Sequence, residues 1–388
     1  MSFNLIIGMG NTGCQIVKAA SKSDRLGNCK FYAIDSVTTS ADMDSVSKIK
    51  IIPMQADQKS GSGRSRERGA TMFEFHDKNG TFNELYSDAE RAKTPIIVIT
   101  SAAGGTGSGS TPLLCKKLID MLATEEDESP VVPIIICPAM KDPDAFHLNT
   151  NDLFLDLNAA GVQTYSVLRN EYGKADYTEI NNEVVTMLEI ILGKKYDKTD
   201  LDSIDESDLD VILATPGRFI AVECEASTPS QLKRHITEKV LNGHQPAWSQ
   251  NDSRNTTMMT AFGLSSPFAS GDFEEVFSEI NARIEHRYDE YRNICNKDGS
   301  CKASIIVAGL PRATVKIIDT EFQSATGIAE GIESKSIRPN FMKRKGGVRS
   351  VVTPKDVQPK PAKKVEQPTD DSDDETDLSA LKSFNIMR

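Results

Sequence analysis

The sequence of 388 residues contains no long hydrophobic run. A helix that crosses a bilayer needs about 20 consecutive apolar residues, and the most apolar segments here, residues 131–137 and 305–307, are far shorter. The chain opens with Ser2, Phe3 and Asn4, without a basic segment or a cleavage site. We therefore expect no membrane-spanning segment, no secretory signal and no membrane partner.

Paired cysteines are also missing. Seven cysteines form no CxxC pair and no paired Cys/His spacing, at positions 14, 29, 115, 137, 224, 295 and 301. This pattern argues against zinc ribbons and disulfide-bonded scaffolds, and it predicts no metal centre built from protein ligands. It favours a reducing, cytoplasmic environment.

Positive charge is in deficit, because 45 Lys and Arg face 56 Asp and Glu, for a net charge of −11. Such a surface disfavours non-specific nucleic-acid binding, so we expect no direct nucleic-acid contact by the globular part. The composition is 38% hydrophobic and 26% charged, which is ordinary for a globular protein and excludes a wholly disordered chain.

Short apolar segments alternate with helical patterns in the first 170 residues. Helical spacing of apolar side chains marks residues 15–20 and 112–122. The predicted strands are apolar runs at residues 4–7, 31–34, 50–52, 95–101, 131–137 and 163–168. Continuous apolar strands that alternate with helices are typical of a parallel sheet covered on both faces. We therefore predict an α/β fold for this part.

The pattern changes beyond a helix predicted at residues 178–192 and an acidic stretch at residues 197–210. A smaller α+β domain is predicted there, with helices at residues 229–241 and 273–293, strands at residues 219–223, 257–263 and 303–308, and a further helix at residues 313–334.

The C-terminal segment differs in composition from the rest. Residues 335–364 carry ten Lys and Arg against one acid, and residues 370–377 carry six acids. With prolines at positions 354, 359, 361 and 368 and few large apolar residues, this segment cannot form a core, and we predict a disordered tail. Apolar residues return at helical spacing in residues 378–386, which fits either a partner-docking motif or a frayed end.

The first chemical motif is a GxGxxG sequence at residues 8–13, between a predicted strand and a predicted helix. Asp35 ends the next strand, where an acid would meet a ribose hydroxyl. Read alone, this is the fingerprint of a dinucleotide-binding fold. Glycine patterns of this kind also arise as plain tight turns.

The second motif, residues 101–110, holds four glycines within six residues between a predicted strand and a predicted helix. Glycines let the backbone turn tightly, and N–H groups at a helix N-terminus favour phosphate. No lysine follows the glycines, so this is not a Walker A loop. A flexible linker is the alternative, but linkers rarely lie between a buried strand and a buried helix.

A third glycine loop, residues 61–64, follows the third predicted strand. It could close over a terminal phosphate with Arg64 offering charge, or it could be a flexible surface loop. Three glycine loops on one carboxyl edge suit a nucleotide with a polyphosphate tail better than a dinucleotide.

Residues 102–110 resemble the signature loop of the tubulin/FtsZ family, GGGTGSG, with Ala103 in place of the first glycine. The resemblance covers residues 1–335 and is closest to the plasmid- and phage-borne members of that family, the TubZ and PhuZ types. It implies a parallel-sheet GTP-binding domain joined by a central helix to a smaller α+β activation domain, with a long C-terminal helix and a disordered tail. The implied boundaries are 1–177, 178–200 (central helix and entry to the catalytic loop), 201–312, 313–337 and 338–388.

The resemblance also implies which residues bind GTP or GDP. Asn170 and Asn181 fit the places of two asparagines that contact ribose and guanine in the family, with Asn182 or a plain helix-terminal asparagine as alternatives. The other implied nucleotide-binding residues lie in the loops: Gly10, Asn11, Thr12, Gly13, Gln15, Asp35, Gly63, Arg64, Ala103, Gly104, Gly105, Thr106, Gly107, Ser108 and Gly109.

The family's catalytic loop follows the central helix and acts on the nucleotide of the neighbouring subunit. Residues 200–205 resemble it, which implies catalytic roles for Asp202 and Asp205 in orienting the attacking water and positioning a cation such as Mg²⁺. Asp200 is at the position where the family has asparagine, and Asp208 and Asp210 make the register of the loop ambiguous. A solvated acidic face is the alternative.

The resemblance therefore implies a polymerising GTPase of the bacterial cytoplasm that segregates or positions plasmid or phage DNA. The partners it implies are further copies of the chain, head to tail, and a DNA-binding adaptor held by the tail; a merely solubilising tail is the alternative. Two other functions remain open from the sequence: an NAD-dependent oxidoreductase, and a nucleotide-binding regulator that neither polymerises nor hydrolyses.

Overall fold

The computed structural model describes residues 3–37, 48–54, 61–124, 130–139, 141–170, 177–192, 206–228, 230–232, 234–235, 238, 260–264, 290–294 and 301–310. All of them belong to the first of the two units into which the chain divides, residues 1–342. The predicted C-terminal helix and tail lie outside the described residues.

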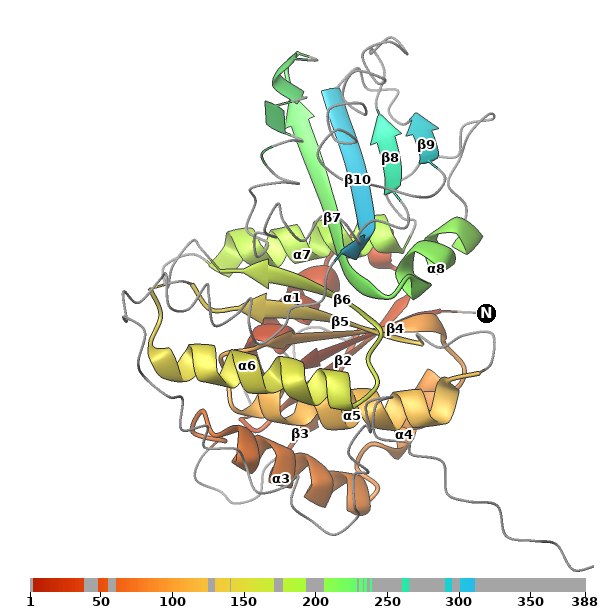
Figure 1. Cartoon of the computed structure of the whole chain (residues 1–388). Helices are drawn as coiled ribbons and strands as arrows, with labels where there is room; N and C mark the ends of the chain where they lie inside the picture. Colours follow the sequence, from red (N-terminus) through yellow and green to blue (C-terminus); the bar gives the residue numbers. More distant parts are fainter. Residues whose placement is uncertain are drawn as a thin grey trace, which may run out of the picture. The chain divides into compact units, whose positions relative to one another are not determined.

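The described strands form one sheet in the order β3-β2-β1-β4-β5-β6-β7-β10-β8-β9 (Figure 1). Six of them belong to the N-terminal part: β1 (Asn4–Met9), β2 (Cys29–Asp35), β3 (Ile49–Pro53), β4 (Lys93–Ser101), β5 (Val131–Cys137) and β6 (Thr164–Arg169). All neighbouring pairs among these six are parallel. The predicted parallel sheet is therefore confirmed.

Helices cover both faces of this sheet (Figure 1). On one face, α1 (Gly10–Ala20) and α7 (Tyr177–Ile191) pack in one hydrophobic cluster. On the other face lie α3 (Arg66–Lys78), α4 (Asn83–Ala89), α5 (Thr106–Leu122) and α6 (Asp144–Ala159). Every residue of β5 is buried, because a strand sandwiched between two helical layers has no face toward water.

The sheet continues into the second half of the chain. After α8 (Glu206–Ala214), β7 (Gly217–Ala226) pairs with β6 in parallel. β10 (Cys301–Leu310) then lies antiparallel to β7 and to β8 (Thr260–Leu264), and β9 (Glu290–Ile294) is parallel to β8.

One predicted element is wrong where the structure describes it. The helix predicted at residues 273–293 overlaps β9, which is a strand paired with β8 through Thr260 and Glu290. Pairing with a neighbouring strand overrides the local helical pattern there. Within the described ranges, no helix is long and apolar enough to cross a membrane.

Candidate functional site

The glycine loops meet at the carboxyl edge of the sheet. β1 lies between β2 and β4. Successive strands are added on one side of β1 as far as β3, and on its other side from β4 onward, so the strand order changes direction between β1 and β4. Ligands of open α/β sheets bind in the crevice at such a switch in strand order. The loops that follow β1 and β4 touch at this point, since a Cβ added to Gly10 would lie 2.9 Å from the Gly107 nitrogen.

Two helices begin at this crevice without a cap. The residues before α1 and α5 are Met9 and Gly105, and neither helix start has a side-chain cap hydrogen bond or an acid in its first turn. Their first N–H groups therefore keep their partial positive charge, which favours an anion. Of the side chains predicted to lie here, Asn11 is exposed, and Thr12 and Gln15 are half-buried.

Close backbone packing accounts for most glycines of the signature-like loop. A Cβ would lie 2.4 Å from the Ser62 Oγ at Gly105, 2.5 Å from the Thr100 Oγ1 at Gly107, and 2.1 Å from the Arg66 oxygen at Gly109. A Cβ at Gly104 would meet nothing within 4 Å. Gly104 is therefore the glycine of this loop that faces open space.

Three buried hydroxyls join the loop that follows β2 to the glycine loops at residues 61–64 and 101–110. Thr106, at the start of α5, shares a hydrogen bond of 2.6 Å with Ser36, which follows β2. The same Thr106 hydroxyl donates to Ser62 Oγ at 3.0 Å, and the Ser62 N–H donates to Ser36 Oγ at 3.3 Å. Neither Ser36 nor Ser62 was among the predicted site residues. Ser36 lies outside every recognised motif, and in the third glycine loop, residues 61–64, only Gly63 and Arg64 were named.

Asp35 is buried at the end of β2 and accepts a hydrogen bond of 2.7 Å from the Ser36 N–H. Burial raises its pKa, and bonds from Ser36, Val37 and Thr106 only partly offset this. The carboxylate is thus held by its own loop and by the start of α5.

The third loop passes through left-handed backbone at Gly63 (φ 61°) and Arg64 (φ 67°). The Arg64 guanidinium lies over the Phe146 ring of α6, 4.8 Å from its centroid. Arg64 is exposed and therefore stands at the rim of the crevice rather than inside it.

The predicted base-side residues lie on β6 and α7. Asn170 follows β6, is 9% exposed, and its Oδ1 has no hydrogen-bond partner among the described residues. Such a buried acceptor costs free energy until a donor reaches it. On α7, Asn181 is half-buried and Asn182 is exposed.

Tyr177 was missed by the sequence analysis. It is the first residue of α7 and is 48% exposed. Because residues four apart share one face of a helix, Tyr177 lies over the same side of α7 as Asn181. The spacing of an aromatic residue four positions before an asparagine was the available signal.

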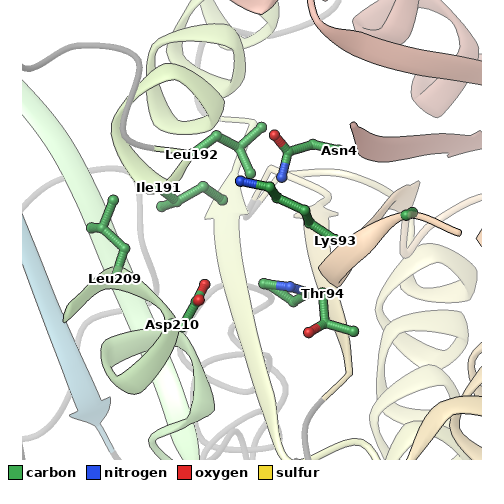
Figure 2. A pocket seen from close by; sticks show the side chains of 9 residues that line it. Asn4, Lys93, Thr94, Ile191, Leu192, Leu209 and Asp210 are labelled. Carbon is green, nitrogen blue, oxygen red and sulfur yellow. The ribbon is translucent and has the colours of Figure 1, made fainter. Parts of the chain in front are cut away.

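A pocket of about 420 Å³ lies at the opposite, amino edge of the sheet (Figure 2). We call it the amino-edge pocket; it is lined by Asn4, Ala92, Lys93, Thr94, Pro95, Ile191, Leu192, Leu209 and Asp210. Asn4 and Lys93 begin β1 and β4, whereas the glycine loops follow the ends of the same strands. The end of α7 and the middle of α8, at Leu209 and Asp210, therefore lie on the edge away from the loops.

The predicted catalytic residues Asp202 and Asp205 lie outside the described residues. In the ranges that are described, no group of three or more His, Cys, Asp or Glu could hold a metal ion.

Comparison with known proteins extends these findings. A family model described as "Tubulin like" matches residues 63–270, more than half of the chain. A comparison with curated protein sequences found no match.

Solved structures with this fold include three informative neighbours. The GDP-bound monomer of CetZ1 from Haloferax volcanii has a TM-score of 0.63 and 21% identity, over 84% of this chain and 98% of its own. The TubZ of Clostridium botulinum phage c-st has a TM-score of 0.61 and 14% identity, over 83% and 98%. A GTPγS-form protofilament of Bacillus thuringiensis serovar israelensis TubZ has a TM-score of 0.63 and 17% identity, over 84% and 92%. These likenesses confirm the predicted fold class.

Proposed function

Because the chain belongs to the tubulin-like family, we propose that it binds GTP at the carboxyl edge of its sheet and hydrolyses it where two copies meet head to tail in a filament. The neighbouring structures support the guanine nucleotide and the filament, since CetZ1 is GDP-bound and the Bacillus TubZ forms a GTPγS protofilament.

The phosphates would lie against the starts of α1 and α5. Both starts lack a cap and an acid, and the open space at Gly104 leaves room beside them. Backbone N–H groups would bind the phosphate oxygens, and the helix dipoles would offset their charge. Gly10, Thr106 and Gly107 lie close enough together to bind the same phosphate chain.

The nucleoside would lie toward β6 and α7. A ribose hydroxyl or a base N–H could donate to the buried Oδ1 of Asn170. The half-buried amide of Asn181 can both donate and accept, which suits the edge of a guanine. The exposed ring of Tyr177 offers an apolar face on which a purine can stack.

The arrangement of the two edges carries the proposal of hydrolysis between copies. α7 begins at the carboxyl edge and spans 15 residues, which is about 22 Å of helix. Its end and Leu209 of α8 both line the amino-edge pocket. Asp202 and Asp205 fall between these two flanks in the sequence, so they would serve the nucleotide of the next copy rather than their own.

In this mechanism a water oxygen bonds to the γ-phosphorus as the bond to the bridging oxygen breaks, and GDP and phosphate leave. Asp202 and Asp205 of the next copy would orient that water. Contact of one edge with a different edge does not close on itself, so it extends as a filament.

Magnesium is the ion that the family implies for this reaction. The described part of the site offers one carboxylate, Asp35, already bonded to Ser36, and three hydroxyls that bond one another. These residues fit an ion held chiefly by phosphate oxygens and water, as Mg²⁺ often is beside nucleotides. Its chemistry there would be to offset negative charge.

We further propose that the filament segregates or positions plasmid or phage DNA in a bacterial cytoplasm, with residues 338–388 holding a DNA-binding adaptor. Truncation after residue 337 tests the tail: assembly should be unchanged and adaptor binding lost. Unchanged adaptor binding would instead leave the tail as a solubilising segment.

The oxidoreductase hypothesis is not favoured, since the family match and all three neighbours are tubulin-like. Sedimentation of the purified protein with GTP or with NADH separates the candidates. Pelleting with GTP supports the polymerising GTPase, whereas binding of GTP without pelleting or hydrolysis would indicate a regulator.

The GTPase rate per molecule, measured over a range of protein concentrations, tests the mechanism. We expect it to rise with concentration, because each site needs a second copy. Asp202→Ala and Asp205→Ala should retain GTP binding, lose hydrolysis and give longer-lived filaments. Asp120→Ala, at an exposed residue paired with Lys116 on α5, is the matched control and should behave as wild type. A rate per molecule that does not change with concentration contradicts hydrolysis between copies.

A further inference from the structure

Arg66 is a buried arginine that follows the third glycine loop, and its backbone packs against Gly109 of α5. It is the first residue of α3 and is 3% exposed. Its Nη2 donates to the Asp156 carboxylate at 2.5 Å, and its Nη1 donates to the Asn149 carbonyl at 2.9 Å. Both partners belong to α6, so the first residue of α3 is tied to another helix by charge and by hydrogen bonding.

Asn149 extends this connection to two loops. Its side-chain amide donates to the Ala103 carbonyl at 3.0 Å and to the Arg64 carbonyl at 3.3 Å. Ala103 belongs to the signature-like loop and Arg64 to the third loop. We call Arg66, Asn149 and Asp156 the Arg66 clasp.

The start of α3 cannot shift without moving α5. A Cβ at Gly69 would lie 2.4 Å from the Gly105 oxygen, and Ser110 Oγ donates to the Gly69 carbonyl at 3.0 Å. The backbones of the two helices are therefore in direct contact. Residues 61–65, which lead into α3, are held from one side by α5 and from the other by the clasp.

Holding α3 and α6 together through a buried ion pair costs free energy, because both charged groups lose water. Burial lowers the pKa of Arg66 although Asp156 and Asp152 oppose this, and burial raises the pKa of Asp156 more than Arg66 lowers it. The Arg66 Nε has no hydrogen-bond partner among the described residues. Apolar side chains of similar size often pack as well as a buried ion pair or better. What the ion pair adds is direction, since a guanidinium fixes its partners at defined angles.

We propose that the Arg66 clasp is the positioning device that holds residues 61–65 against the terminal phosphate, and so sets the preference of this protein for GTP over GDP. The inference rests on the proposed nucleotide site and assigns Arg66 no contact with the nucleotide. The clasp acts through the third loop, which is the part of the site that a diphosphate leaves without a ligand.

The test compares dissociation constants for GTPγS and GDP in wild type, Arg66→Met and the double variant Arg66→Met with Asp156→Leu. The double variant leaves no unpaired buried charge, so it remains informative if Arg66→Met does not fold. In both Arg66→Met and the double variant, we expect the ratio of the GDP to the GTPγS dissociation constant to fall about tenfold, with the GDP dissociation constant nearly unchanged. Arg66→Lys keeps the charge but loses the planar guanidinium, so its ratio of dissociation constants should lie between those of wild type and Arg66→Met. Arg234→Met, at an exposed arginine paired with Glu238, is the control and should keep the wild-type ratio.

Thermal unfolding of the same variants separates a structural role from a positioning role. Lower stability with an unchanged ratio of the two dissociation constants would overturn the inference, as would a wild type that binds both nucleotides equally. Failure of the wild type to bind either nucleotide would instead refute the proposed function.

Discussion

Glycines in the loop between β4 and α5 serve two separate purposes. Gly105, Gly107 and Gly109 are required by backbone packing, because a Cβ at each would lie within 2.5 Å of a neighbouring atom. Gly104 has open space where a Cβ would be. Under the proposed function, stability and nucleotide binding would depend on different glycines of the same loop.

A matched pair of alanine substitutions tests this division. Gly107→Ala should lower the free energy of unfolding by about 1–3 kcal/mol, since overlap with Thr100 and Met9 outweighs the gain of about 1 kcal/mol from helix propensity. Gly104→Ala should change it by less than about 0.5 kcal/mol and should weaken GTP binding about tenfold. Urea unfolding and calorimetry measure the two effects. A destabilised Gly104→Ala protein with normal GTP affinity would contradict the assignment.

Asp88 gives a prediction about pH. Its carboxylate on α4 is buried and accepts bonds from Lys30 at 2.9 Å, Tyr32 at 2.8 Å and Arg91 at 2.6 Å. Burial alone would raise its pKa, but the bonds from Lys30 and Tyr32 and the charges of Lys30 and Lys50 outweigh burial, and the pKa lies below its usual value. A depressed pKa in the folded state stabilises the fold above the unfolded value of about 3.9, and this is lost as pH falls through the folded value.

Asp88→Asn should therefore lower the free energy of unfolding at pH 7 by about 1–3 kcal/mol. The deficit relative to wild type should shrink as the pH is lowered from about 5 toward 2, where the wild-type carboxylate is protonated too. Urea unfolding at several pH values measures both. Asp120→Asn, at an exposed ion pair, should lower the free energy of unfolding by less than about 0.5 kcal/mol at any pH. A deficit that stays constant with pH would mean that the Asp88 charge is not what stabilises the fold.

At the scale of elements, α7 joins the two edges of the sheet. Ile180, Val184, Met187 and Leu188 are buried along one stripe, as the helical spacing predicted. This stripe fixes the rotation of the helix, and so it decides that Asn181 is half-buried while Asn182 is exposed. The sequence alone left these two asparagines as alternatives for the guanine contact.

Replacing each asparagine separately tests the register of α7. Asn181→Ala should weaken GTP binding about tenfold or more and reduce the preference for GTP over ATP, because a hydrogen-bonding edge for the base is lost. Asn182→Ala is the matched control and should bind both nucleotides as wild type does. The reverse result would place Asn182, and with it a different face of α7, at the base.

Elements with strong local signals could be predicted, and contacts between elements could not. The strands of the parallel sheet are continuous apolar runs, and the glycine loops carry recognisable spacing. The direct contact of α3 with α5 joins Ser110 to Gly69, 41 positions apart, and the Arg66–Asp156 pair joins residues 90 positions apart. The sequence has no local signal for either contact. The helix predicted over β9 fails for the same reason, since its strand is defined by its pairing with β8.

At the scale of the whole molecule, the two edges of the sheet would have different roles under the proposed function. The carboxyl edge holds the three loops, and the amino edge receives the end of α7 and the middle of α8. In the proposed mechanism the nucleotide of one copy needs Asp202 and Asp205 of the next, so a single copy would be incomplete. Polymerisation and hydrolysis would then be coupled.

Mixing two inactive variants tests that claim most directly. Asp202→Ala with Asp205→Ala keeps the nucleotide loops but lacks the acids. Gly104→Asp keeps the acids and places a negative charge in the open space beside Gly104, where the proposed function places phosphate. We expect the mixture to hydrolyse GTP at a rate well above the sum of the two separate rates. A mixture whose rate equals that sum would contradict it.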